Sequence, residues 1–500
     1  MASGKEKLDA FKFARRRMVA NLLVPTPTGS DEGAPRPVKT FVASILIGVV
    51  AVAGMTVLGY LKPSAPSGWQ NGLAVDGTTG AAYVDNGGEL HPILNITSAQ
   101  LLLGTTFTKY DVPDSVINAQ KVGAPLGILG APPVAPAASQ VDLKSWTYCQ
   151  QAENPDNQGI AGGQTVLEIG YGQGSTTAVT AGSGFIVHDS KGDNYLLAGN
   201  YSYRIAPIRG LEGTVSGDGN DDIAPAGTWV SDSFLNVFEA GAPIEDFPKV
   251  RDLGAKVTRL NQPANAVIGS YGTGPNNNSY YIETDSGLVQ VTEFVYDLYS
   301  GYGELAANNV LHFTPALTQS EITNADVIDE RTNPTDILNV GNTWPTSQIT
   351  TDDLDAQQPG YAALCVNYNG QFDPSQDNIP ELSLWYGAQL PNPTAGIGVS
   401  SGGGQYADSI DVLAGHGALS RDVANGNSAN DGPIFLTLAT GSRYQLETDP
   451  GVDGKAQKSA LDNLQYKDVP LEPVPENWMA LVPAGARLDP NAAGQPSNSE

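Results

Sequence analysis

The sequence predicts an α+β fold rich in β-structure, with one N-terminal transmembrane helix and an elongated domain of β-hairpin and helix modules around a central β core. Three observations predict this fold. Residues 41–61 form an uncharged apolar run. The 57 Gly and 35 Pro favour short strands and many turns over long helices. After residue 61, alternating apolar segments that turn at Gly or Asn recur along the chain.

The composition is that of a globular protein, with 40% hydrophobic and 16% charged residues. Its 500 residues suffice for several domains or for an array of smaller units. The chain carries 26 Lys+Arg against 53 Asp+Glu, a formal net charge of -27. Because such a field repels phosphate groups, the composition argues against nucleic-acid binding as the main role.

The first 40 residues differ in charge from the rest of the chain. They hold eight basic and four acidic residues, a charge of +4, which leaves -27 - 4 = -31 for the remainder. Residues 5–24 predict a helix with Leu8, Phe11, Met18 and Leu22 near one side and basic residues around them. The pattern fits equally a helix lying on the inner leaflet and one docked on a partner. A Pro- and Gly-bearing linker follows at 25–37.

The apolar run 41–61 is long enough to cross a bilayer. At about 1.5 Å per residue, a helix of this length spans roughly 30 Å, the thickness of the hydrocarbon core. Arg36 and Lys39 precede the run, and after Lys62 the next basic residue is Lys109. By the positive-inside rule, residues 1–40 are predicted to be cytoplasmic and residues 62–500 to be exported.

A cleaved signal peptide is the alternative interpretation of this segment. Its apolar region would be shorter, about 7–15 residues, and would follow a brief basic start. Here a leader of 40 residues comes first, and Pro66 adjoins the small residues Ser64 and Ala65. We therefore favour an uncleaved anchor. Small residues within it are spaced for packing against another transmembrane helix, namely Ser44, Gly48, Ala51 and Gly54.

Four segments after the anchor predict a hairpin, in some copies followed by a helix. In the clearest, 73–104, the turn is Asn86-Gly87-Gly88, and Thr97 or Ser98 is expected to cap the helix. In 279–303 the turn is at residues 285–287 and Thr292 opens the helix. The other copies are 433–449 with a helical segment at 455–464, and a weaker one at 183–206. The irregular spacing argues against a close-stacked solenoid.

The boundaries predicted from these patterns follow the chain in order. Residues 134–140 and 467–475 look like connectors, and the polar end from Pro490 is expected to be disordered. The predicted segments are a cytoplasmic helix and linker (1–40), the transmembrane helix (41–61), module 1 (62–125), the first part of the central core (126–182), module 2 with a connector (183–260), module 3 (261–320), the second part of the core (321–410), module 4 (411–466) and a C-terminal extension (467–500).

The chain has two cysteines, Cys149 and Cys365, both on the predicted exported side. In an oxidising compartment such a pair is first interpreted as a disulfide, with two buried free thiols as the alternative. We favour the disulfide. Closing a loop of over 200 residues would stabilise the fold by up to about 5 kcal/mol in the chain-entropy model. Two cysteines and four scattered histidines do not predict a zinc site.

Motifs for catalysis are incomplete in this chain. Residues 451–459, which include Lys455, miss the spacing of a phosphate-binding loop. Ser400 stands in a G-x-S-x-G pattern, but the glycines that follow make a poor helix start and His416 is too near in sequence. Residues 218–222 begin like a calcium loop but lack its Gly and its closing Glu. The sequence therefore predicts no catalytic, cofactor or metal site, and favours a structural role.

Several segments are similar to the EccB family of type VII secretion. The resemblance starts at the membrane exit, Tyr60-Leu61-Lys62-Pro63, and continues through GLAVDGTTGAAYVDNGGELHPILNITSAQLLLG. It runs in order through GILGAPPVAP (127–136), SWTYCQ (145–150), ALCVNYNG (363–370), GHGALSRDV (415–423), FLTLATGSRYQL (435–446) and LVPAGARLDPNAA (481–493). Insertions around 215–222 and 396–409 depart from the family pattern.

The resemblance implies a non-enzymatic structural subunit of the type VII secretion inner-membrane complex, which scaffolds and oligomerises the channel through its periplasmic domain. Cys149 and Cys365 match the two periplasmic cysteines of the family, which supports the disulfide. The implied partners are EccC-like ATPase, EccD-like, EccE-like and mycosin-like subunits, other copies of the chain, and the inner membrane, with no cofactor. Family members have been described as ATPases, an activity for which this sequence shows no nucleotide-binding motif.

A second hypothesis is a membrane-anchored protein that binds the cell envelope, in particular peptidoglycan. The tyrosines of the third module would then stack on sugars, whereas the alternating spacing favours packing in the hairpin and helix core. These side chains are Tyr280, Tyr281, Tyr296 and Tyr299.

Overall fold

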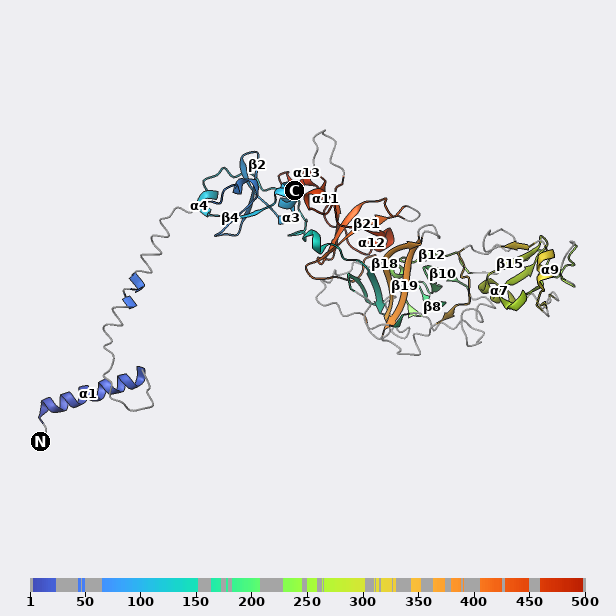
Figure 1. The fold of residues 1–500 in the computed structure, drawn as a ribbon, viewed down its shortest axis with the longest axis horizontal. Coiled ribbons are helices and arrows are strands. Elements are labelled where there is room, and N and C mark those ends of the chain that lie inside the picture. Colours follow the sequence, from blue (N-terminus) through green and yellow to red (C-terminus); the bar gives the residue numbers. More distant parts are fainter. Residues whose placement is uncertain are drawn as a thin grey trace. The chain divides into compact units, whose positions relative to one another are not determined.

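The structure is a computed structural model (Figure 1). It describes residues 3–23, 44–45, 47–49, 65–151, 163–171, 177–178, 182–206, 228–244, 250–258, 263, 265–301, 310, 312–313, 316–325, 327–329, 343–351, 363–373, 379–387, 390, 405–424, 428–448 and 459–497. The chain divides into two compact units. The first comprises Met1–Ser67, Asp76–Thr79 and Asp111–Ala119, and the second comprises Gly68–Val75, Gly80–Tyr110 and Gln120–Glu500.

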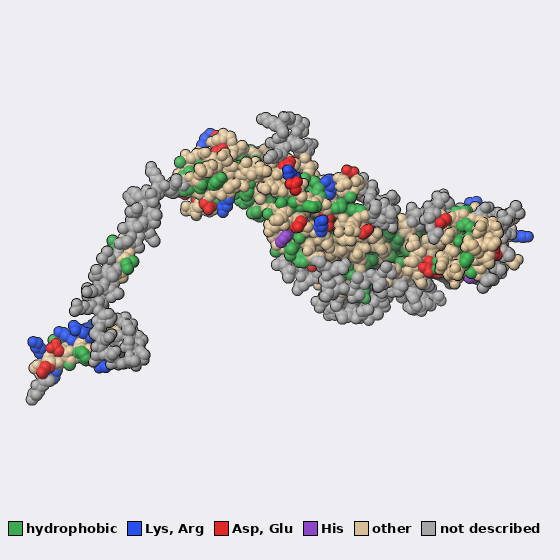
Figure 2. All heavy atoms as spheres, in the orientation of Figure 1, with side chains coloured by type: hydrophobic (Ala, Val, Ile, Leu, Met, Phe, Trp, Pro, Cys, Tyr) green, Lys and Arg blue, Asp and Glu red, His purple; other side chains and the backbone are tan. Residues whose placement is uncertain are grey.

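The first unit contains the predicted basic helix, α1 (Gly4–Leu23). Lys and Arg side chains gather over α1 in Figure 2, and apolar side chains such as Phe11 and Met18 are exposed beside them. The short helix α4 (Asp114–Ile117) belongs to the same unit. Helix α1 therefore exposes both basic and apolar side chains.

The structure describes only part of the predicted transmembrane segment. Ser44, Ile45 and residues 47–49 are helical, whereas Ala51 and Gly54 lie outside the described residues. A Cβ atom added at Gly48 would meet no heavy atom within 4 Å. Among the described residues, no helix is both long and apolar enough to span a membrane. The packing role of Ser44, Gly48, Ala51 and Gly54 stays a prediction.

The β-rich α+β fold is confirmed, since short strands form several separate sheets joined by short helices. Two four-stranded sheets share one topology: the first strand lies between the second and the fourth, and a helix precedes the fourth. One is built from β1 (Leu73–Asp76), β2 (Ala82–Asn86), β3 (Glu89–Pro92), α3 (Ile96–Leu103) and β4 (Lys109–Val112). The other is built from β21 (Gly417–Val423), β22 (Ile434–Leu438), β23 (Ser442–Leu446), α11 (Ala460–Asn463) and β24 (Glu472–Pro475). Modules 1 and 4 are thus two copies of the same unit.

The third module has a different strand order. Its strands lie in sequence order, and the last pairs parallel with the third. Thr292 caps α7 as predicted, accepting a hydrogen bond from Val295 N. The elements are β13 (Tyr271–Thr273), β14 (Tyr280–Glu283), β15 (Leu288–Val291), α7 (Glu293–Ser300), α9 (Gln319–Asn324) and β16 (Val327–Asp329).

Residues 183–206 form an antiparallel meander rather than a separate small module. The three strands are the middle of a six-stranded sheet, to which strands from later in the chain add in parallel. The strands are β8 (Ser183–His188), β9 (Asn194–Ala198), β10 (Tyr201–Ile205), β11 (Thr228–Trp229), β12 (Glu239–Ala240) and β17 (Thr350–Thr351), with the helix α6 (Asp232–Leu235) between β11 and β12.

The central sheet combines two distant parts of the chain, in the order β20-β6-β5-β18-β19-β7. It therefore draws on both segments that the sequence assigned to the core. Its strands are β5 (Trp146–Gln151), β6 (Thr165–Ile169), β7 (Thr177–Ala178), β18 (Ala363–Asp373), β19 (Ile379–Gly387) and β20 (Ser409–Val412). Large side chains packed here include Trp146, Tyr148, Phe185, Phe234 and Trp478.

The cap of α3 differs from the prediction. Thr97 and Ser98 lie inside the helix, and Asn95 is the N-cap: its Oδ1 accepts a hydrogen bond from Ser98 N at 2.9 Å. Asn95 has an extended backbone, which suits an N-cap, and its Nδ2 donates to Ile128 O at 2.9 Å. The Asn95 side chain therefore caps the start of α3 and also holds the later loop at Ile128.

The C-terminal extension is folded through residue 497, in contrast to the expected disorder from Pro490. The helices α12 (Glu476–Met479) and α13 (Pro490–Ala493) follow β24. Ala493 is fully buried in a core that also holds Leu101 of α3. Leu126 pairs with Pro496. A polar, Pro-bearing segment is ordered here because it covers apolar surface of an earlier module.

Candidate functional site in the disulfide-bonded central sheet

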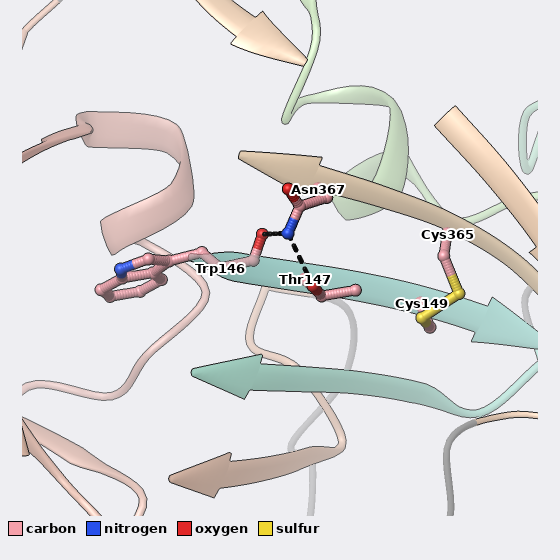
Figure 3. The surroundings of a disulfide bond; sticks show 5 residues. All are labelled: Trp146, Thr147, Cys149, Cys365 and Asn367. Carbon is pink, nitrogen blue, oxygen red and sulfur yellow. Dashed lines mark hydrogen bonds between the residues drawn. A yellow bond between two sulfur atoms is a disulfide. The ribbon is translucent and has the colours of Figure 1, made fainter. Parts of the chain in front are cut away.

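Cys149 and Cys365 face each other on adjacent antiparallel strands and form a disulfide (Figure 3). Their Cα atoms are 4.0 Å apart, although the residues are separated by 216 positions. Both are fully buried beside Trp385 of β19, which is the register partner of Cys365. The bond therefore closes a very long loop inside a core and is shielded from solvent.

A hydrogen-bonded amide extends this link two residues along the same strands. Asn367 Nδ2 donates to Thr147 Oγ1 at 2.8 Å, to Ser145 Oγ at 2.8 Å and to Trp146 O at 3.3 Å. Figure 3 shows the amide of Asn367 directed at β5 next to the disulfide. Residues two apart on a strand share a face, so the amide and the disulfide lie in one row. The row fixes the register of β5 against β18.

A buried carboxylate connects this row to the C-terminal sheet. Glu472 of β24 is 2% exposed, and it accepts hydrogen bonds from Trp146 Nε1 at 3.1 Å and from Ser145 N at 3.2 Å. Burial raises the pKa of Glu472 to about 7. Gly370 leaves room for it, since a Cβ there would lie 2.7 Å from Glu472 Oε1. The central sheet and β24 are thus held by polar as well as apolar contacts.

A pair of carboxylates lies at the edge of the central sheet. Glu168 of β6 and Asp411 of β20 are register partners. Burial, and then the charge of Asp411, raise the pKa of Glu168 to about 7. Tyr171 Oη donates to Asp411 Oδ1 at 3.1 Å. Within the described part of the chain, no group of three or more His, Cys, Asp or Glu is placed to hold a metal ion.

Several residues weighed as chemical candidates lie outside the described residues, namely Ser400, Lys455 and 218–222. The four histidines contact different partners. His91 Nδ1 is 2.7 Å from Ala124 O, His188 packs on Trp229, and His312 Nε2 is 2.8 Å from Tyr296 Oη. His416 contacts Ala414 O.

The tyrosines proposed for sugar stacking are mostly in the core of the third module. Tyr281, Tyr296 and Tyr299 are buried, and Tyr299 Oη donates to Gly269 O at 2.8 Å. Tyr280 is half-buried and donates to Glu293 Oε1. Their burial favours the packing interpretation and removes most of the surface on which the envelope-binding hypothesis depends.

The sequence did not identify Glu472 or β24. The sequence predicts a connector at residues 467–475, whereas the structure places Pro473 and Pro475 in β24. The structure shows why they are tolerated: β24 is the outermost strand of its sheet, where prolines are accepted. A Glu between apolar residues in an alternating segment is the signal that would have placed it.

Comparison with known proteins agrees with the resemblance seen in the sequence. A family model described as type VII secretion system ESX-1, transport TM domain B, matches residues 2–498. The ESX-3 secretion system ATPase EccB3 of Mycobacterium tuberculosis is 25% identical, over 97% of this chain and 88% of that protein. The ESX-1 secretion system ATPase EccB1 of Mycolicibacterium smegmatis is 24% identical, over 79% of this chain and 77% of that protein.

Solved structures share the fold. A chain of an intact ESX-5 inner membrane complex matches with a TM-score of 0.63 and 19% identity, covering 100% of this chain and 96% of that one. An EccB3 dimer from the ESX-3 core complex matches with a TM-score of 0.61 and 21% identity, covering 85% and 99%. Since the family model spans nearly all of the sequence, this chain belongs to the EccB family of type VII secretion systems.

Proposed function

We propose that this chain is a single-pass structural subunit of a type VII secretion complex in the inner membrane. Residues 1–40 are cytoplasmic, residues 41–61 cross the membrane and residues 62–500 are periplasmic. The charge difference of +4 against -31 on the two sides of the apolar run supports this topology. A buried disulfide in residues 62–500 fits an oxidising compartment.

The observation that carries the structural role is the cross-linked central sheet. Its strands come from two distant parts of the chain, residues 146–178 and 363–412, and they are held by the disulfide, by Asn367 and by Glu472. A domain cross-linked in this way resists deformation. Such rigidity suits a subunit that holds other subunits in position. We propose that EccC-like, EccD-like, EccE-like and mycosin-like subunits and further copies of the chain are those partners. The similar structures, a chain of an ESX-5 inner membrane complex and an EccB3 dimer, support this.

We further propose that the chain has no enzymatic activity of its own. The word ATPase in the names of its relatives is the main reason to expect one. The segment 451–459, which carries Lys455, does not have the spacing of a phosphate-binding loop, and the pattern around Ser400 lacks the context of a nucleophile.

The test is complementation of a deletion strain. Export of the secreted substrates should be lost on deletion and restored equally by the wild-type chain and by the double variant S400A/K455A. Loss of export with the double variant, at normal protein level, would contradict the structural role. A chain lacking residues 41–61 serves as the control that must fail.

A further inference from the structure

The basic helix α1 exposes several large apolar side chains. Phe11 is 67% exposed, Phe13 62% and Met18 75%, and Leu8 and Val19 are exposed as well. They lie within one continuous helix, Gly4–Leu23. Because exposed apolar surface is unfavourable in water, a helix with this many such side chains is suited to a surface that takes them up.

The apolar side chains of α1 fall mainly on one side. Leu8, Phe11 and Met18 are spaced by three and seven residues, which places them along one row of an α-helix. We call these three side chains the apolar row. Residues two apart on a helix lie on nearly opposite sides, so Phe13 lies opposite Phe11. The helix is therefore two-sided, with most of its apolar surface on one side.

Basic residues flank the apolar row on both edges. Lys7 stands four residues before Phe11, and Lys12 four residues after Leu8, so each lysine is the neighbour of one member of the row. Arg15, four residues after Phe11, falls within the row itself. All three basic side chains are exposed. Long basic side chains in such positions lay their methylene stems along an apolar surface and extend their charges to its boundary.

The two acidic residues of α1 lie away from the apolar row. Glu6 and Asp9 stand seven and four residues before Phe13, so they share its side of the helix. Both are exposed. The side with the apolar row is thus basic, and the opposite side carries the negative charge. An anionic surface would attract the first side and repel the second.

The chain itself holds α1 close to such a surface. Residues 24–40 connect the helix to the predicted membrane span 41–61, and they reach at most about 60 Å when fully extended. A tether of this length keeps the helix at a high effective concentration near the membrane. The cytoplasmic leaflet of a membrane is negatively charged and has an apolar interior, so it complements both features of the row.

We propose that α1 lies on the cytoplasmic surface of the membrane and binds anionic lipids there. The apolar row enters the boundary between headgroups and acyl chains, and Lys7, Lys12 and Arg15 contact lipid phosphates. This inference rests on the proposed function, which assigns residues 1–40 to the cytoplasm. An apolar protein groove that accepted the row would have to bury Arg15 with it, which is costly for a charge without a partner. At a lipid surface the same side chain reaches the phosphates.

The test measures contact between α1 and lipid in the full chain, reconstituted without other subunits. The native cysteines are buried in a disulfide, so a substituted cysteine is the one reactive thiol. F11C and F13C are a matched pair, since both replace an exposed Phe of the same helix. Each carries a fluorophore, in vesicles of phosphatidylcholine alone or mixed with phosphatidylglycerol, and is quenched by doxyl-labelled lipid. With phosphatidylglycerol, quenching should be several-fold stronger at F11C than at F13C, and it should weaken several-fold in phosphatidylcholine alone.

Charge variants test the basic edges of the row. In the F11C chain, K7Q/K12Q should lower the quenching several-fold in vesicles with phosphatidylglycerol. E6Q/D9N neutralises the same number of charges on the opposite side and should not lower it. An equal loss in both variants would contradict a role for the basic edges.

A label at I47C, inside the predicted span, separates this inference from the proposed function. If I47C is quenched while F11C is not, or while F11C and F13C are quenched equally, α1 does not lie on lipid through its apolar row. The inference is then wrong, a protein partner becomes the occupant, and the proposed function stands. Quenching at F11C that does not depend on phosphatidylglycerol overturns the anionic-lipid part. If I47C is not quenched in either lipid, the single-pass anchor of the proposed function fails first.

Discussion

The indole Nε1 of Trp146 donates a hydrogen bond to Oε2 of Glu472 at 3.1 Å, across 326 positions of sequence. The two residues belong to the central sheet and to the last strand of the C-terminal sheet. A buried carboxylate held in this way makes the contact between the sheets depend on its protonation.

The stability of the fold should therefore depend on pH through Glu472. Its pKa rises from 4.5 to about 7 on folding, so its stabilising contribution is complete below pH 4.5 and is lost as pH rises through 7. At about 1.4 kcal/mol per unit, the change is about 3 kcal/mol. E472Q should flatten the dependence of the urea midpoint between pH 5 and 8. D468N, a change at an exposed acid before β24, should leave it as in the wild type, and equal slopes for all three proteins would contradict the assignment.

Removal of the disulfide should weaken the fold without changing it. Because it closes a loop of 216 residues, C149A/C365A should lose up to about 5 kcal/mol of unfolding free energy. The double variant avoids leaving one buried thiol. The urea midpoint measures the loss. In the wild type, maleimide should label these cysteines only after denaturation and reduction together, and labelling of the reduced native chain at full rate would contradict their burial.

The contact between modules 1 and 4 should be sensitive at Gly104. Its φ is +55°, and a Cβ would lie 2.7 Å from Asn463 Oδ1. Asn463 Nδ2 donates to Leu101 O at 2.7 Å. G104A should destabilise by about 1–3 kcal/mol, and N463A by about 1–2 kcal/mol. G77A is the control, since nothing lies within 4 Å of a Cβ there.

The two variants at this contact should not be additive. N463A removes the atom that a Cβ at position 104 would meet, so G104A/N463A should cost less than the sum of the single changes. A double-mutant cycle on urea midpoints measures the coupling. Strict additivity would mean that the backbone strain at Gly104, and not its neighbour, sets the cost.

The topology of the chain should show in labelling from outside intact cells. Q495C lies in the folded C-terminal extension and S3C directly before α1, and both side chains are exposed. A membrane-impermeant maleimide should label Q495C in intact spheroplasts and label S3C only after permeabilisation. Labelling of both before permeabilisation would contradict the assignment of residues 1–40 to the cytoplasm.

The sequence predicted structure best where a rule for a few neighbouring residues applies. Gly87 and Gly88 both have positive φ, as a two-residue hairpin turn requires, and Thr292 caps α7. Cys149 and Cys365 were paired because the chain has no other cysteine. Contacts between distant segments were missed. The burial of Glu472, and the order of residues 490–497, depend on surfaces that local pattern does not reveal.

The most direct test of the structural role is recovery of the chain from native membranes. The full-length protein, tagged at its C-terminus, is extracted in a mild detergent, purified, and analysed by native electrophoresis and mass spectrometry. We predict a large assembly that contains an FtsK-like ATPase, a polytopic membrane subunit, a subtilisin-like protease and more than one copy of the chain. Recovery of the chain alone, or with cell-wall fragments only, would contradict the account and favour an envelope-binding protein.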